Sequence, residues 1–308
     1  MLSELTWKLL VVTELPDLVL KDFHQHFELV QGSIDEAAKP GFDAVLLSVE
    51  TRMDAIRIAA LAPSLRAIAT YSVGTDHIDV AAAAARNIAV FNTPDVLSDA
   101  VAEVAMLLLL GAARRVTESI DLIRSGRWSG WTARQLNGSE LVGKQLGILG
   151  LGSIGRRIAM RAEAFGMRVA YTNRTVAAPQ VAGNATFVPD VEDLLRISNA
   201  LVLACPLTDQ TRGFLDARRL AMCQPGIVVV NIGRGDLVMD SALIEALTTG
   251  QVGAAGLDVF SGEPRFDRSY LSLPNVFMLP HIGSSTVETR RRMGIALIDS
   301  LVKLASWG

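Results

Sequence analysis

The strongest constraint on the fold of this chain is the segment 150–155, which reads Gly-Leu-Gly-Ser-Ile-Gly. It follows an apolar run, 145–149, of the kind that forms a buried strand. It precedes a segment of helical periodicity in which one face is formed by Ile154, Ile158, Ala162 and Phe165. A strand, a G-x-G-x-x-G turn and a helix in this order predict a dinucleotide-binding unit.

The glycines of such a turn have separate tasks. Gly150 permits the tight turn, Gly152 lets a pyrophosphate approach the backbone because it has no Cβ, and Gly155 lets the helix pack close to the strand. The helix N-terminus adds N–H groups and the positive end of its dipole. Cofactor contacts are expected from Gly150, Leu151, Gly152, Ser153, Ile154 and Gly155.

Strand and helix signals alternate along the 308 residues, half of which are hydrophobic. This alternation predicts an α/β protein, and the Val-, Ile-, Leu- and Ala-rich composition favours parallel sheets covered by helices. The length favours two domains. Strands are expected near 9–13, 44–48, 67–70 and 88–91 in a smaller first unit. Six more are expected in a second, doubly wound unit, at 145–149, 168–172, 200–205, 227–232, 255–259 and 276–279.

Two predicted helices lie outside this alternation of strands and helices and bear on how the domains and subunits are joined. One starts near Ser98 as its N-cap and is apolar on all sides, which indicates burial between domains or, as we favour, in a dimer. Trp128 and Trp131 follow in a glycine-containing loop, and tryptophan is common at subunit contacts. The last helix, 287–304, is expected to cross back to the first unit.

Composition argues against several classes of protein. The net charge of −3 gives no global basic field for nucleic acid, and the run 290–292 of three arginines is interpreted as a solvated helix face, with phosphate contact a less favoured reading. Cys205 and Cys223 form no metal or disulfide pattern. The longest apolar stretch, 104–113, is too short to span a bilayer. Residues 1–5 include an acid where a signal peptide needs bases, so a cytoplasmic protein is expected.

The cofactor type is predicted from the residues that follow the second strand of the doubly wound unit. An Asp or Glu about 20 residues past the glycines binds the ribose hydroxyls of NAD. Here the sequence is Asn173-Arg174-Thr175, without an acid. Arginine and neutral donors hold a 2′-phosphate, which a carboxylate would repel. We therefore expect NADP(H) to be preferred, with NAD(H) possible; alternatively, Arg174 stacks on the adenine.

Three polar residues, Arg234, Glu263 and His281, follow predicted strands in glycine- or proline-marked loops. Ligands of open α/β sheets bind beyond the carboxyl ends of the strands, so the three can converge on one cleft. Histidine can protonate a carbonyl oxygen near neutral pH, and a neighbouring glutamate orients it and favours the imidazolium. Arginine can pair with a substrate carboxylate and polarise the carbonyl. Taken singly, each has a structural alternative: Arg234 could stabilise a loop, Glu263 could cap a helix, and His281 could be a loop histidine whose hydrogen bonds are all made within the protein.

Together these motifs resemble those of the D-isomer-specific 2-hydroxyacid dehydrogenase family over nearly the whole chain. The matching segments are 72–79, 92–94, 150–155, 205–208, 231–235, 256–264 and 280–284. The resemblance implies two Rossmann-like domains in a homodimer. A discontinuous, flavodoxin-like substrate-binding domain would comprise 1–98 and 285–308, and an inserted, doubly wound NAD(P)-binding domain 99–284. The family's dimers use the helix predicted here at 98–116.

The resemblance also implies residue roles. Arg234 would bind substrate, Glu263 would tune the histidine, and His281 would be the acid/base, while the backbone of Val73 and Gly74 would clamp the substrate carboxylate. Further cofactor contacts would come from Thr93, Cys205, Pro206, Thr208, Ile232, Asp258, His281 and Gly283. No metal is implied.

Within the family, the Asn173-Arg174-Thr175 loop and the tryptophan loop resemble the glyoxylate/hydroxypyruvate reductase branch. A tryptophan of that loop can reach the partner's substrate site there, and we assign this role to Trp131, with Trp128 as the alternative. The loop 47–51 is expected to face substrate, and Glu50 in it would disfavour phosphorylated substrates.

The sequence thus predicts NADPH-dependent reduction of a small 2-keto acid to the D-2-hydroxy acid. Glyoxylate and hydroxypyruvate are the first candidates, and bulkier keto acids remain open. The rival hypotheses are a phosphoglycerate- or formate-type dehydrogenase and a nucleotide-sensing, corepressor-like binding protein on the same fold.

Overall fold

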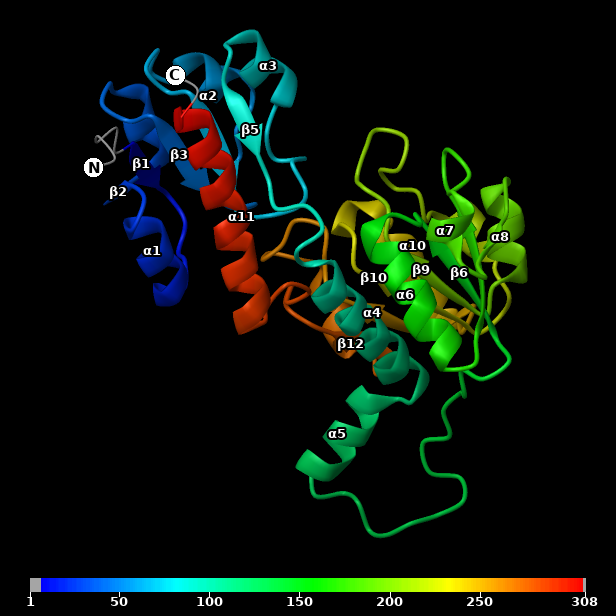
Figure 1. Cartoon of the computed structure of the whole chain (residues 1–308). Helices are drawn as coiled ribbons and strands as arrows, with labels where there is room; N and C mark the ends of the chain where they lie inside the picture. Colours follow the sequence, from blue (N-terminus) through cyan, green and yellow to red (C-terminus); the bar gives the residue numbers. More distant parts are fainter. Residues whose placement is uncertain (1–6, 307–308) are drawn as a thin grey trace. The chain divides into compact units, whose positions relative to one another are not determined.

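The structure is a computed structural model that describes residues 7–306, and it divides into two compact units (Figure 1). Unit 1 comprises Met1–Leu97 and Ser284–Gly308, and unit 2 comprises Ser98–Gly283. Residues 1–5, on which the localisation prediction depends in part, lie outside the described residues. Among residues 7–306, no helix combines the length and apolar character that crossing a bilayer requires.

Unit 1 is built on a five-stranded parallel sheet of order β2-β1-β3-β4-β5, the flavodoxin-like order. Its strands are β1 (Lys8–Val11), β2 (Glu28–Gln31), β3 (Ala44–Leu47), β4 (Ala67–Thr70) and β5 (Ala89–Phe91). The sequence predicted four of these strands. It missed β2, an edge strand with no fully buried residue and therefore no apolar run.

The helices of unit 1 are α1 (Asp17–His24), η1 (Ile34–Ala38), α2 (Ala55–Ala60), α3 (Val80–Ala85) and α11 (Val287–Ser306). The last of these packs along α1 and touches β4 and β5, so the end of the chain completes the first unit. The three arginines at its start each bond within unit 1, Arg290 to Ser285, Arg291 to Asp22 and Arg292 to Thr289.

Unit 2 is built on a seven-stranded parallel sheet of order β12-β11-β10-β9-β6-β7-β8. Its strands are β6 (Gln145–Leu149), β7 (Arg168–Thr172), β8 (Thr186–Phe187), β9 (Ala200–Leu203), β10 (Ile227–Asn231), β11 (Val252–Leu257) and β12 (Val276–Met278). The order reverses at β6, whose two neighbours are β7 and β9, and this reversal is where doubly wound folds bind ligand. The α/β prediction with a doubly wound sheet is confirmed, although the short edge strand β8 was missed.

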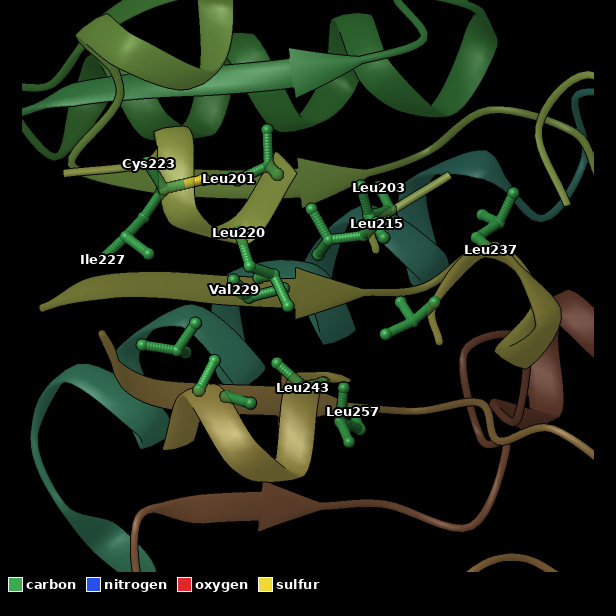
Figure 2. Close-up of a cluster of buried hydrophobic side chains, with 14 of the residues drawn as sticks. Leu201, Leu203, Leu215, Leu220, Cys223, Ile227, Val229, Leu237, Leu243 and Leu257 are labelled. Carbon is green, nitrogen blue, oxygen red and sulfur yellow. The ribbon is translucent and has the colours of Figure 1, made fainter. Parts of the chain in front are cut away.

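The helices of unit 2 are α4 (Ser98–Ala113), α5 (Val116–Arg124), α6 (Ser153–Ala164), α7 (Pro179–Ala182), α8 (Val191–Ile197), α9 (Ala217–Met222), η2 (Gly235–Leu237), α10 (Asp240–Thr249) and η3 (Arg268–Ser272). A cluster of buried side chains joins several of them to the sheet (Figure 2). Leu203 and Val229 of the central strands meet Leu220 of α9 and Leu243 of α10 there. Burying each such side chain is worth about 1.5–3 kcal/mol, which fixes the strand ends that carry the site loops.

The prediction of one helix over 98–116 is wrong at its C-terminal end. Helix α4 ends at Ala113, Arg115 has a left-handed backbone (φ 56°), and α5 starts at Val116. Ser98, predicted as the N-cap, is the first helical residue. Contacts with α6, β10, β11 and β12 account for the buried faces of α4 within unit 2, whereas α5 buries no residue.

Candidate active site

The glycine turn between β6 and α6 is shaped by close packing at two positions and by open space at the third. A Cβ at Gly150 (φ 102°) would lie 2.8 Å from the backbone nitrogen of Cys205, and one at Gly155 would lie 2.2 Å from the Gly150 carbonyl oxygen. At Gly152, apart from its neighbours along the chain, no atom of the described residues lies within 4 Å of a Cβ position. Protein packing therefore does not require glycine there, whereas a pyrophosphate close to the backbone would. The turn fits a dinucleotide.

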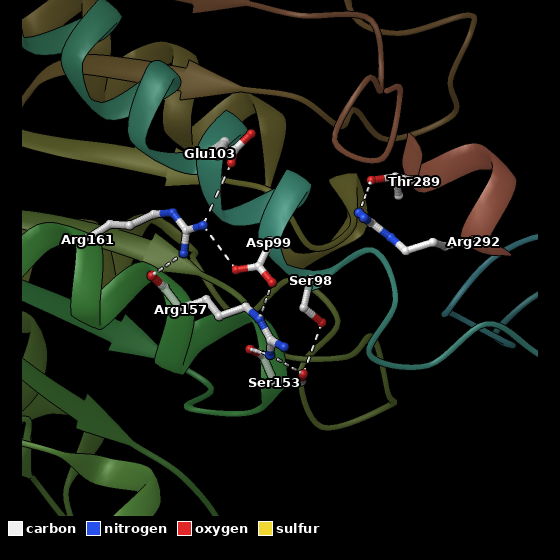
Figure 3. A network of polar contacts seen from close by, with 8 residues as sticks. All are labelled: Ser98, Asp99, Glu103, Ser153, Arg157, Arg161, Thr289 and Arg292. Atoms are coloured by element: carbon white, nitrogen blue, oxygen red, sulfur yellow. Dashed lines mark hydrogen bonds and ion pairs between the residues drawn. The ribbon is translucent and has the colours of Figure 1, made fainter. Parts of the chain in front are cut away.

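Ser153, at the start of α6, is held by a polar network that joins α6 to α4 (Figure 3). Arg157 Nη1 donates to Ser153 Oγ at 2.8 Å and to its carbonyl at 3.0 Å, and Ser98 Oγ donates to Ser153 Oγ at 3.0 Å. Arg157 Nε and Arg161 Nη2 both donate to Asp99. The Arg157 hydrogen bond is the largest cause of the lowered pKa of the Asp99 carboxyl. The network fixes the first turn of α6, where a phosphate would bind.

Asn173 tethers the glycine turn from the end of β7. Its Oδ1 accepts from the Leu151 N–H at 2.7 Å, and its Nδ2 donates to the Leu151 carbonyl at 3.4 Å. The side chain expected to face a 2′-phosphate thus bonds to the turn itself, while Arg174 and Thr175 are exposed. The prediction did not include this contact, because nothing in the sequence shows which way an amide turns.

The remaining predicted cofactor contacts of unit 2 follow the strands of its sheet. Cys205, Pro206 and Thr208 come after β9, and Thr211 secures them by accepting from the Thr208 N–H and donating to the Pro206 carbonyl, both at 2.8 Å. Burial raises the pKa of the Cys205 thiol to about 11, so it stays protonated and unreactive at neutral pH. Ile232 and Asp258 follow β10 and β11 and are buried.

His281 and Glu263 form a hydrogen-bonded pair, with 2.5 Å between Nδ1 and Oε1. The second carboxylate oxygen, Oε2, accepts from the Phe260 N–H at 3.1 Å. Burial acts to raise the pKa of the Glu263 carboxyl. The hydrogen bond and the charge of His281 outweigh this effect, and the Phe260 N–H and the charge of Arg234 add smaller effects in the same direction. The pKa of Glu263 is therefore lowered. An ionised carboxylate has no proton to give, so Nδ1 is the donor and Nε2 is left for substrate.

The backbone of His281 has a left-handed conformation (φ 53°) that Asp258 holds in place. The His281 N–H donates to the Asp258 carbonyl, and the N–H groups of Ile282 and Gly283 donate to its two carboxylate oxygens, each at 2.8 Å. Asp258 is 2% exposed, and its burial raises the pKa of the carboxyl. Sequence reasoning assigned Asp258 to the cofactor and missed this bracing role.

Arg234 lies beyond β10 in a loop that Asn231 closes. Asn231 Nδ2 donates to the Arg234 carbonyl at 2.9 Å, and its Oδ1 accepts from the Gly233 N–H at 3.1 Å. The Arg234 guanidinium lies close enough to Glu263 for its charge to lower the pKa of that carboxyl. Unit 2 therefore brings Arg234, Glu263 and His281 together. The buried Asn231 was not among the predicted site residues.

Three predicted site residues, Val73, Gly74 and Thr93, belong to unit 1, where they follow β4 and β5. Thr93 is fully buried, and its N–H donates to the Ser72 carbonyl. Trp131, by contrast, lies between α5 and β6 and is 84% exposed, whereas Trp128 is 54% exposed. No cluster of three or more metal-binding side chains occurs within residues 7–306.

The Glu263–His281 pair predicts a pH-dependent part of the stability. Because the folded state depresses the pKa of Glu263, its stabilisation is present above the ordinary carboxyl pKa of 4.5 and is lost as the pH falls through the lower folded value. Glu263→Gln should therefore lower Tm at pH 7 and lower it by a smaller amount at pH 3.5, which lies below the ordinary carboxyl pKa. The loss should be at most about 1 kcal/mol, since the pair is one-third exposed.

Differential scanning calorimetry at both pH values measures this difference. Glu140→Gln, at an exposed carboxylate, serves as the matched control and should change Tm little at either pH. An equal loss of Tm at pH 7 and pH 3.5 for Glu263→Gln would contradict the assigned charge state.

The doubly wound sheet and its glycine turn are typical of dinucleotide binding. Together with a histidine–glutamate pair beside an arginine, they define an oxidoreductase that depends on a nicotinamide dinucleotide. More specifically, the chain belongs to the D-isomer specific 2-hydroxyacid dehydrogenase family, whose NAD-binding domain matches residues 106–283. It is an NAD(P)-dependent 2-hydroxyacid dehydrogenase.

Similar proteins extend this family match over almost the whole chain. Glycerate dehydrogenase of Hyphomicrobium methylovorum is 37% identical, over 96% of this chain and 95% of its own. Glyoxylate reductase of Pyrococcus horikoshii is 38% identical, over 96% and 92%. The crystal structure of an NADPH-dependent glyoxylate/hydroxypyruvate reductase from Sinorhizobium meliloti, in complex with NADP and malonate, is similar with a TM-score of 0.88 and 36% identity, covering 98% of this chain and 94% of that one.

Proposed function

We propose that the protein reduces a small 2-keto acid of the glyoxylate/hydroxypyruvate type to the D-2-hydroxy acid, with NADPH as the preferred reductant. The observation that carries the proposal is the His281–Glu263 pair beside Arg234, in the same unit as the glycine turn. The glyoxylate, hydroxypyruvate and glycerate enzymes among the similar proteins support this substrate class.

The side chains divide the reaction between them. The nicotinamide, when bound, supplies a hydride for the carbonyl carbon. His281, oriented through Nδ1 by Glu263, gives the proton on Nε2 to the carbonyl oxygen. Arg234 pairs with the carboxylate and polarises the carbonyl. One keto acid, one reduced cofactor and one proton thus give one hydroxy acid and one oxidised cofactor.

Backbone groups complete the binding of both molecules. The N–H groups of Val73 and Gly74 would bind the substrate carboxylate. The turn residues of 150–155 would hold the pyrophosphate, while Thr93, Pro206, Thr208, Ile232, Asp258 and Gly283 would line the rest of the cofactor site. Among these, Asp258 also keeps the His281 loop in position, so it contributes to both tasks.

An assay of NADPH oxidation at 340 nm with a panel of 2-keto acids tests the function. We expect higher turnover with glyoxylate and hydroxypyruvate than with phenylpyruvate or phosphohydroxypyruvate. Phosphohydroxypyruvate should be a poor substrate because the carboxylate of Glu50, exposed in the loop after β3, would repel its phosphate. A silent panel with NADPH still bound would contradict the proposal and favour a nucleotide-sensing binding protein.

The preference for NADPH rests on the segment after β7. Asn173 faces the glycine turn and leaves Arg174 and Thr175 exposed to receive a 2′-phosphate. Arg174→Ala should lower kcat/KM for NADPH by about 10–100-fold, the worth of one hydrogen bond to a charged group, and leave kcat/KM for NADH nearly unchanged.

Steady-state kinetics with both cofactors measure this effect, and Arg268→Ala, at another exposed arginine of unit 2, is the matched control. Equal losses for the two cofactors would show that Arg174 stacks on the adenine instead. A wild type that prefers NADH would contradict the cofactor assignment outright.

The homodimer is proposed from the surface of α5 and the segment that follows it. Helix α5 buries none of its residues, and Ile123, Trp128 and Trp131 are more than half exposed. Exposed aromatic and aliphatic side chains of this density are typical of a subunit contact. A second copy would cover them, with Trp131 the side chain that reaches the partner's substrate site. Light scattering should give a dimeric mass, and a monomer would contradict this assembly.

A further inference from the structure

We propose that Thr70, Ser72 and His77 form a one-way hydrogen-bond relay that positions the backbone of Val73 and Gly74 for the substrate carboxylate. The inference deepens the proposed function and rests on it. The three side chains are positioning residues, since they act on substrate through the backbone that they hold.

The direction of the relay follows from counting protons. Ser72 Oγ lies 2.8 Å from the Gly74 carbonyl, which accepts only, so the Ser72 hydroxyl donates there. Thr70 Oγ1 lies 2.8 Å from Ser72 Oγ and must donate to it, because the one proton of Ser72 is already used. His77 Nε2 lies 2.9 Å from Thr70 Oγ1 and must donate in turn. Nε2 of His77 therefore carries a proton.

The relay is one of three contacts that fix successive carbonyl groups. Asn92 Nδ2 donates to the Val73 carbonyl at 2.8 Å, and the Thr93 N–H donates to the Ser72 carbonyl at 2.9 Å. With the Ser72 hydroxyl on Gly74, all three carbonyls of residues 72–74 are bonded. In a trans peptide the N–H points opposite to the C=O of the same peptide unit. The N–H groups of Val73 and Gly74 therefore point away from the groups that bond to the carbonyls of Ser72 and Val73.

Those N–H groups are available for a ligand. Within residues 7–306, no protein group accepts a hydrogen bond from the N–H of Val73 or Gly74. Both residues are half-buried, and they follow the carboxyl end of β4 after Tyr71 and Ser72. Successive N–H groups of this kind form a concave site for an anion. The two oxygens of a carboxylate match the two N–H groups in number.

Burial explains why the relay holds the loop firmly. Thr70 is 0% exposed and Ser72 is 8% exposed, so water does not compete for their hydroxyls. A buried hydroxyl without a partner is costly, and this cost favours the arrangement in which the hydroxyls of Thr70 and Ser72 are both bonded. The rest of β4 is alanine and isoleucine, so packing alone does not call for a hydroxyl at Thr70.

The test compares Thr70→Val, which keeps the shape and removes the hydroxyl, with Thr70→Ser, which keeps the hydroxyl. Thr70→Val should raise KM for glyoxylate or hydroxypyruvate by about 10-fold, as for a weakened hydrogen bond to a charged group, with a smaller change in kcat. The Kd of NADPH, measured by fluorescence, should not change. Thr70→Ser should restore KM to near the wild-type value.

Two results would overturn the relay. One is an unchanged KM in Thr70→Val, and the other is an equal rise in KM for both variants, which would indicate packing alone. If the wild type reduces no keto acid, the proposed function fails, and the relay is then judged by ¹⁵N NMR of His77. Protonated Nε2 at neutral pH supports the relay, and unprotonated Nε2 contradicts it.

Discussion

His281→Gln should lower kcat for keto acid reduction by about 10²–10⁴-fold, the usual worth of a positioned general acid. Glutamine retains a side-chain amide that can bond to Glu263, so the loop held by Asp258 should keep its conformation. It has no proton to give to a developing alkoxide at neutral pH. The loss should therefore fall on the chemical step.

Single-turnover kinetics at saturating NADPH measure that step, and fluorescence titration should give an unchanged Kd for NADPH. His24→Gln, at an exposed histidine of α1, is the matched control and should keep full activity. Retained turnover of His281→Gln at neutral pH would remove His281 from its assigned role.

Arg234→Gln should lower kcat by about 10²–10³-fold, as the loss of one donor to the reacting oxygen does elsewhere. KM for the keto acid should rise as well, because the carboxylate loses its charged partner. Arg234→Lys should recover little of either, since an ammonium cannot form the two parallel hydrogen bonds of a guanidinium.

The same assay with a keto acid series separates these two effects. Arg218→Gln, at an exposed arginine of α9 that pairs with Glu192, is the matched control. If Arg234→Gln raised KM and left kcat unchanged, Arg234 would bind the substrate without polarising its carbonyl.

The central strands and the glycine turn were predictable because their physical causes are local. A strand buried on both faces must be an apolar run, as in β3, β4, β9 and β10, and a phosphate turn needs glycine at fixed spacing. The edge strands β2 and β8 lack that run, so periodicity did not show them. The break between α4 and α5 depends on the left-handed backbone of Arg115, which its sequence does not require.

The supporting contacts of the site were not predictable for a different reason. Asp258 braces a loop 24 to 25 residues further along the chain, and Asn173 reaches back 22 residues to Leu151. Such pairs are set by how the strands are ordered in the sheet and by side-chain rotation, which no local pattern encodes. The sequence could identify Arg234, Glu263 and His281 as candidates because all three follow strand ends, where parallel sheets bind ligand.

The most direct test of the proposed reaction follows the hydride and the stereochemistry together. Hydroxypyruvate is reduced with NADPH that carries deuterium at the transferable C4 position, and the glycerate is analysed by NMR and chiral chromatography. Hydride transfer from NADPH to the proposed face of the substrate gives D-glycerate with deuterium on C2. L-Glycerate, or glycerate whose C2 hydrogen comes from water, would contradict the proposed reaction.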